Sequence, residues 1–272
     1  MTETPRSELV LVTPEMAAAM LANNPSNRNI RGKVVDMYAR DMGNEKWLVT
    51  GESIKLDKSG ALIDGQHRLT AVVKSGVAVW MYITTGLDKS AQSVMDMALR
   101  RATSDNLHMQ GELNASTLVA VVRLSIAHER GITIGRSVMP LSNSEIYEWV
   151  QCNPEVREAV AIAVRHSKKT LCPASLVGFS CWLIWETVGS WYDVDEFWAA
   201  ASEKIGLRHG DPVIALTNRF VQDKAQHKRI PPVAVVSAIV RAWNLRRVGK
   251  TMTLVKYDSP GKGFIPIPKV VK

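Results

Sequence analysis

The chain has 272 residues, 46% of them hydrophobic and 22% charged, with a formal net charge of +8. This length suits one large or two ordinary domains, and this composition is typical of a soluble globular protein with a hydrophobic core. The polar first residues predict no secretory signal, and the most apolar window, 176–191, is interrupted by Ser180, Glu186 and Gly189, so we expect no membrane span.

The first hundred residues predict a small α+β domain. A β-like run at 9–12 precedes Thr13-Pro14-Glu15, which has the N-cap, the proline and the first-turn acid of a helix start. The other elements expected here are a helix at 32–42, strands at 53–56 and 62–63 joined by a hairpin turn at 57–60, a strand at 77–84 and a helix from 88 to about 99. A charged hinge at 100–106 follows, with Arg100 and Arg101 at its start.

The stretch 62–73 reads Leu-Ile-Asp-Gly-Gln-His-Arg-Leu-Thr-Ala-Val-Val and predicts a strand, a tight turn at Gly65 and a helix. A helix that starts directly after a glycine presents backbone N–H groups and the positive end of its dipole at the turn, where anions bind. Gln66, His67 and Arg68 add side-chain donors, and Arg68 can grip a phosphate through two hydrogen bonds. The alternative is an ordinary surface turn with a solvated His-Arg pair.

The motif Asp64-Gly65-Gln66-His67-Arg68, followed by Leu-Thr-Ala, resembles the Asp-Gly-Gln-His-Arg signature of the ParB/sulfiredoxin superfamily. It is similar to the Gly-Glu-Arg-Arg motif of chromosome-partition ParB proteins and to the Gly-Cys-His-Arg motif of sulfiredoxins. It is most like the DGQHR proteins, which include DndB-type regulators and phage-encoded ParB-like proteins. The resemblance covers about residues 5 to 100.

The resemblance implies a ParB/sulfiredoxin-like nucleotide-binding domain at 1–102, in which Gly65, Gln66, His67 and Arg68 wrap the phosphates of ATP or CTP. It also implies that Arg28 faces the nucleotide, although a surface arginine beside a turn is the alternative. Gln66 stands where sulfiredoxins have their catalytic cysteine, so we reject sulfiredoxin activity. The chain lacks the Glu-Asn-x-x-Arg segment that completes the CTP site of chromosomal ParB, so CTP specificity is not carried over.

Asp64, His67 and Arg68 are the candidate catalytic residues if the nucleotide is hydrolysed. Arg68 and the backbone amides would stabilise charge on the transferring phosphoryl group, and Asp64 would hold a Mg²⁺ ion that bridges the phosphates. The chain has no nucleophile elbow, no His-Glu-x-x-His motif and no paired-cysteine motif. Whether the protein is a nucleoside triphosphatase is therefore left open.

Residues 103–272 predict a mostly α-helical basic domain with an extended C-terminal tail. Helices are expected at 115–130, from the capping box at 142–145, at 154–169, at 176–185, from 193, from 212 and from 232, followed by a strand-like run at 252–257. The segment 219–272 has twelve Lys and Arg against two acids, a net charge of +10. The rest of the chain has 22 against 24, a net charge of −2, so the basic character is local.

This segment predicts a polyanionic partner, most simply DNA, although an exposed basic tail that only keeps the protein soluble is the alternative. The candidate DNA-binding residues lie at the end of the last helix: Arg241, Arg246, Arg247 and Lys250. They could equally neutralise the dipole of their own helix. The eight tryptophans fall mostly on apolar faces, where core packing is the simpler interpretation.

The resemblance, together with the basic C-terminal segment, implies a nucleotide-binding, DNA-associated phage-type ParB-like protein that regulates or maintains DNA. Three cysteines without metal-ligand spacing indicate free thiols in a reducing compartment, and the resemblance implies a phage origin, so we expect the protein in the cytoplasm of a bacterial host, with no membrane partner. A homodimer is left open. The alternatives are an NTPase subunit of a DNA-modification system and a host-directed protein-interaction factor with a vestigial pocket.

Overall fold

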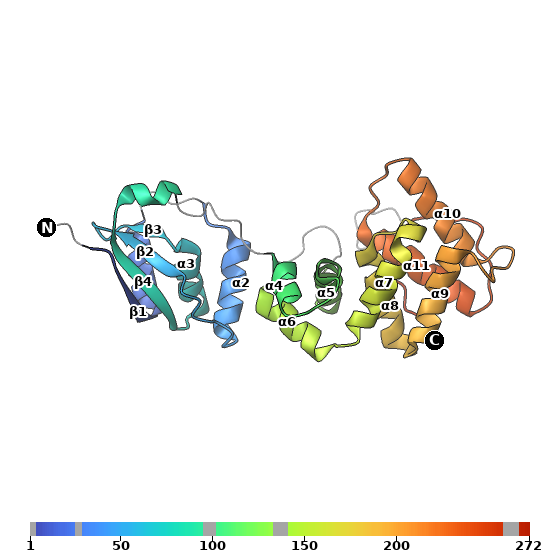
Figure 1. Cartoon of the computed structure of the whole chain (residues 1–272), viewed down its shortest axis with the longest axis horizontal. Helices are drawn as coiled ribbons and strands as arrows, with labels where there is room; N and C mark the ends of the chain where they lie inside the picture. The colour runs from blue at the N-terminus through green and yellow to red at the C-terminus, as the bar shows by residue number, and fades with distance from the viewer. Residues whose placement is uncertain (1–3, 25–28, 95–101, 133–140, 258–266) are drawn as a thin grey trace. The chain divides into compact units, whose positions relative to one another are not determined.

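The computed structural model describes residues 4–24, 29–94, 102–132, 141–257 and 267–272 (Figure 1). These residues form four β-strands and eleven α-helices, so the general α+β class predicted from the sequence is confirmed. The chain divides into two compact units, residues 1–100 with 139–145, and residues 101–138 with 146–272. All four strands belong to the first unit, and the regular elements described in the second unit are helices.

The first unit contains the elements expected around the motif. They are β1 (Arg6–Val12), α1 (Pro14–Ala22), α2 (Gly32–Gly43), β2 (Ser53–Asp57), β3 (Leu62–Asp64), α3 (Gln66–Ser75), β4 (Val79–Leu87) and the 3-10 helix η1 (Lys89–Val94). The sheet has the order β1-β4-β2-β3, in which β4 pairs antiparallel with β1 and parallel with β2. The predicted hairpin is confirmed, because β2 and β3 pair antiparallel across the turn. The helix predicted up to about residue 99 is a 3-10 helix in its first part, and residues 95–101 lie outside the described residues.

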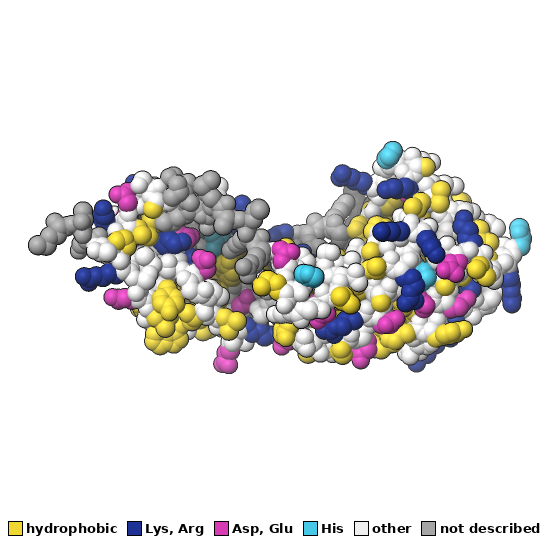
Figure 2. All heavy atoms as spheres, viewed as in Figure 1, with side chains coloured by type: hydrophobic (Ala, Val, Ile, Leu, Met, Phe, Trp, Pro, Cys, Tyr) yellow, Lys and Arg dark blue, Asp and Glu magenta, His cyan; other side chains and the backbone are white. Residues whose placement is uncertain are grey.

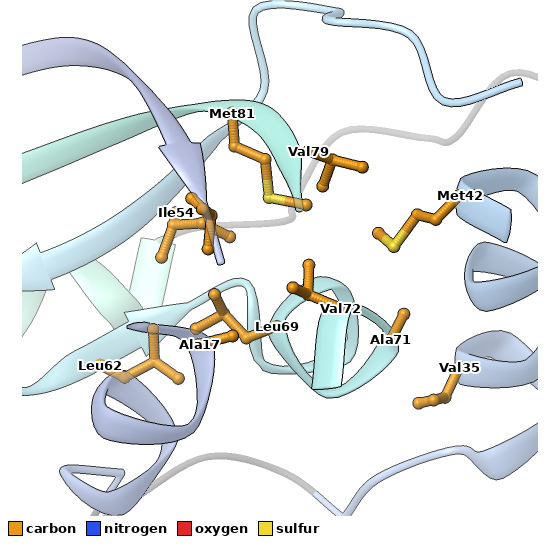
Figure 3. Packing of buried hydrophobic residues seen from close by; sticks show 11 residues of the cluster. Ala17, Val35, Met42, Ile54, Leu62, Leu69, Ala71, Val72, Val79 and Met81 are labelled. Atoms are coloured by element: carbon orange, nitrogen blue, oxygen red, sulfur yellow. The ribbon is translucent and has the colours of Figure 1, made fainter. Parts of the chain in front are cut away.

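The core of the first unit lies between one face of the sheet and the helices α1 and α3, and α2 packs on α3 (Figure 3). Side chains from every one of these elements meet there: Val12, Ala17, Val35, Met42, Ile54, Leu62, Leu69, Ala71, Val72, Val79 and Met81. Leu69 is fully buried, and replacing such a leucine with alanine costs about 2–5 kcal/mol. This packing fixes the start of α3 relative to β2 and β3.

The second unit contains α4 (Thr103–Met109), α5 (Ala115–Glu129), α7 (Val156–Thr170), α8 (Ala174–Val188), α9 (Trp191–Glu203), α10 (Pro212–Ala225) and α11 (Pro232–Arg247), and α6 (Asn143–Cys152) begins in the first unit. The capping box is confirmed at Ser142, whose N–H donates to Glu145 at 2.8 Å and whose Oγ accepts the N–H of Glu145 at 3.1 Å. Trp182, Trp198 and Trp243 are buried, as expected for core residues. No described helix has the length and apolarity needed to cross a membrane.

Two sequence predictions for the second half are wrong. Residues 103–106, predicted as part of a hinge, begin α4, because the Asp105 carboxylate accepts the N–H of Ala102 at 2.9 Å and caps the first turn. Residues 252–257 form no strand, because no other strand of the described chain lies in this unit to pair with them. Instead the Tyr257 hydroxyl donates to Asp223 at 2.6 Å. Arg100 and Arg101 lie outside the described residues.

Candidate functional site

The candidate site is built on the turn between β3 and α3. Gly65 is the N-cap of α3 and has a φ of 105°, in the left-handed region that favours glycine. A Cβ atom at this position would lie 2.5 Å from Cδ1 and 3.3 Å from Cα of Ile54, so the turn also needs glycine for space. The predicted strand, turn and helix are confirmed, and the dipole of α3 points its positive end at the turn.

Arg68 and Lys55 gather around the carboxylate of Asp64 beside this turn. Oδ2 of Asp64 lies 2.8 Å from Nζ of Lys55 and 3.5 Å from Nη2 of Arg68. The same Nη2 donates to the carbonyl oxygen of Ser53 at 2.9 Å. The three charged side chains are 14–24% exposed, so they are largely shielded from solvent but still accessible to a ligand. The cluster has two cations and one anion, a net charge of +1.

The carboxyl group of Asp64 stays ionised beside these cations. Burial raises its pKa, but the hydrogen bond from Lys55 and the charges of Arg68 and Lys55 together outweigh burial and hold the pKa below its usual value. Asp64 therefore fixes the positions of Lys55 and Arg68 at neutral pH. An arginine held at one end by a carboxylate loses less side-chain entropy when it binds a ligand.

Gln66 and His67 are buried, at 5% and 9% exposure, and contact the chain before α2. Oε1 of Gln66 accepts a hydrogen bond from Asn24 at 3.3 Å. Nε2 of His67 accepts the backbone N–H of Arg31 at 3.0 Å, so a neutral imidazole here has its proton on Nδ1. These two side chains therefore point to different partners from Arg68.

The structure thus brings Asp64, Gly65 and Arg68 together and directs Gln66 and His67 towards Asn24 and Arg31. Arg28, the remaining candidate, lies outside the described residues. Sequence reasoning missed Lys55. The hairpin turn at 57–60 indicates that β2 and β3 pair, but a register irregularity next to Lys55 hides which β2 residue lies opposite Asp64.

The described residues do not form a metal centre. In this part of the chain no three His, Cys, Asp or Glu side chains gather in a way that could hold a metal ion. Oδ2 of Asp64 already has two cationic groups within 3.5 Å, and a divalent ion would compete with both of them. These residues do not fit a protein-held Mg²⁺ ion, so we derive no step through one.

The candidate DNA-binding residues of the second unit differ in their surroundings. Arg246 lies 2.5 Å from Asp211 and 2.8 Å from Glu196, and Arg247 lies 3.1 Å from Asp193. A cavity of about 160 Å³ is lined by Asp193, Glu196, Phe197, Trp243, Arg246 and Arg247. Lys250 is exposed, and Arg241 donates to the carbonyl oxygen of Lys256 at 3.5 Å.

A second cluster that the sequence did not reveal joins α7 to α9. His166 is 2% exposed, with Nδ1 at 2.8 Å from Oγ of Ser202 and Nε2 at 3.0 Å from Oδ1 of Asp195. The residue types are those of a hydrolase triad. Ser202 lies in the last turn of α9, however, where the negative end of the helix dipole would destabilise an oxyanion. We interpret the cluster as a polar link between the two helices.

Comparisons with known proteins return no match: no protein-family model, no curated protein and no solved structure matches the chain.

Proposed function

We propose that the first unit binds a nucleoside triphosphate, ATP or CTP, with its phosphates at the start of α3, and that the protein is a DNA-associated protein of the phage ParB-like type. The observation that supports this most strongly is the pair of cations Lys55 and Arg68 beside a glycine turn that opens a helix. Two cations and a helix N-terminus attract a polyanion.

Arg68 is the residue that we expect to grip a phosphate. Within the described part of the chain its hydrogen bond and ion pair both use Nη2, which leaves the N–H groups of Nε and Nη1 for a ligand. Lys55 uses Nζ for Asp64 and has further N–H donors on the same atom. Gly65 lets the turn adopt the left-handed conformation from which α3 starts. Gln66 and His67 hold Asn24 and the backbone of Arg31 close to the same turn.

The DNA contact is proposed for the basic segment of the second unit. Since Arg246 and Arg247 are paired with acids, the exposed Lys250 is the candidate that we expect to reach a phosphate backbone. The acids reduce the local charge below the value suggested by the sequence. We therefore expect DNA binding through few phosphate contacts.

Isothermal titration calorimetry with ATP, CTP and GTP, each with Mg²⁺, tests the nucleotide site. We expect wild-type protein to bind at least one nucleotide and Arg68→Ala to bind it about tenfold or more weakly, the size of a lost charge-assisted hydrogen bond. Lys74→Ala is the matched control, because it removes a cation from the exposed other end of the same helix. Absence of heat from wild-type protein with all three nucleotides would refute the proposal.

Gel-shift titrations at increasing salt test the DNA contact. Lys250→Ala should weaken binding of all sequences and reduce the slope of log K against log salt by about one. Lys168→Ala, on the exposed face of α7, removes the same charge outside the basic segment and should leave the slope unchanged. Equal slopes for both variants would contradict the assignment. Release of phosphate from the bound nucleotide when DNA is added would favour an NTPase of a DNA-modification system.

A further inference from the structure

The face of the sheet that points away from α1 and α3 is apolar and exposed at one end. Along β1 and β4 the core side chains alternate with Leu9, Leu11 and Trp80, which are 47%, 41% and 50% exposed. Figure 2 shows hydrophobic side chains gathered where β1 and β4 lie. The Nε1 atom of Trp47 donates to the carbonyl oxygen of Trp80 at 3.4 Å, which supports the strand beneath the exposed indole.

The strand register orders this open face in rows. Leu11 pairs with Trp80, Leu9 pairs with Tyr82, and the next row contains Thr84 and Lys55. Lys55 belongs to the open face because its neighbours Ile54 and Leu56 on β2 pack in the core. The face therefore changes from apolar and aromatic at Trp80 to cationic at Lys55, and Arg68, from the first turn of α3, reaches the Asp64 carboxylate with which Lys55 is paired.

The spacing of the rows suits a chain of stacked bases. Alternate residues on one face of a strand lie about 6.6 Å apart, a step that an extended nucleotide chain can match. Aromatic side chains stack on bases of any sequence, and a nearby cation binds the backbone phosphate. A protein partner would cover the apolar rows but has no general need for the adjoining pair of cations.

We propose that this open face binds a short single-stranded nucleic acid, with one phosphate at Lys55 and Arg68 and successive bases stacked on Tyr82 and Trp80. The inference rests on the proposed function, because the strand's phosphate takes the place of the triphosphate. The bound nucleotide would then be one unit of a chain, and its neighbour would lie over Trp80. Both single-stranded DNA and single-stranded RNA have the required phosphates and bases.

Fluorescence anisotropy with labelled eight-nucleotide oligo-dT and oligo-rU tests the inference on the full-length chain. Trp80→Ala should weaken binding about 5- to 150-fold, as loss of one stacked base does. Tyr192→Ala is the matched control, because Tyr192 is an aromatic residue 80% exposed on α9 of the second unit, and it should change nothing. Lys55→Ala should lower the slope of log K against log salt by about 0.7, the value for one phosphate of a single strand. Circular dichroism verifies that each variant is folded.

The same variants separate this inference from the proposed function. Arg68→Ala should weaken both the oligonucleotide and the free triphosphate, whereas Trp80→Ala should weaken only the oligonucleotide. Triphosphate binding without oligonucleotide binding would overturn the inference and leave the proposed function standing. Oligonucleotide binding that Trp80→Ala does not change would also overturn it. So would sedimentation that shows a Trp80-dependent dimer in the absence of nucleic acid, because a second protein chain would then cover the face.

Discussion

Replacing Gly65 with alanine tests whether the turn at the start of α3 is built as described. The new Cβ would lie 2.5 Å from Cδ1 of Ile54, and the residue would keep a φ of 105°. An L-residue in the left-handed region costs about 1–2 kcal/mol, and overpacking a core costs about 1–3 kcal/mol. We therefore expect the free energy of unfolding of the first unit to fall by about 2–5 kcal/mol.

Gly76→Ala is the matched control for this prediction. Gly76 ends the same helix with a φ of 68°, and an added Cβ would meet nothing within 4 Å, so the substitution should cost only the conformational part, about 1–2 kcal/mol. Adding Ile54→Val to Gly65→Ala removes the atom at 2.5 Å and should recover part of the loss, although Ile54→Val alone costs about 0.5–1.5 kcal/mol.

Urea unfolding followed by circular dichroism measures these changes, and hydrogen exchange of the α3 amides shows whether the loss lies in the first unit. The double-mutant cycle should give a favourable coupling between the two substitutions. If Gly65→Ala costs no more than Gly76→Ala, the close approach of the turn to Ile54 is not as described, and the tight backbone path at the candidate site fails with it.

Three further predictions concern charges and thiols. The pKa of Asp64 is lowered in the folded protein, so Asp64→Asn should destabilise the first unit at pH 7. Urea unfolding should show that the free energies of unfolding of variant and wild type become more similar as the pH falls below about 4, where the carboxylate is protonated. A difference between them that persists at low pH would contradict this prediction. Ellman's reagent should modify one thiol of the folded protein, the exposed Cys152, and all three in urea, because the other two cysteines are buried and burial raises their pKa; rapid reaction of three thiols in the folded state would refute the burial. Arg246→Ala should lower the free energy of unfolding of the second unit by about 1–3 kcal/mol, because it leaves the buried carboxylate of Asp211 without its partner. Urea unfolding measures this change, and a value below about 0.5 kcal/mol would show that the ion pair is not formed.

The sequence alone determined the local elements of the protein. The run from Leu62 through Gly65 to Val73 predicts a strand, a turn and a helix, because the apolar periodicity and the glycine act over a few residues. The hairpin before it, the capping box at Ser142 and the helices from residue 115 onward are predicted for the same reason. Each of these signals involves residues that are close in the chain.

Only the tertiary structure decided which side chains meet at the candidate site. Lys55 reaches Asp64 because β2 and β3 pair with an irregular register, and His67 accepts the N–H of Arg31 from a loop 36 residues earlier. In the second unit, acids of α9 and the start of α10 neutralise Arg246, which the sequence suggested was available to DNA. Such pairings depend on how distant segments of the chain pack against one another, and composition and periodicity carry no information about that packing.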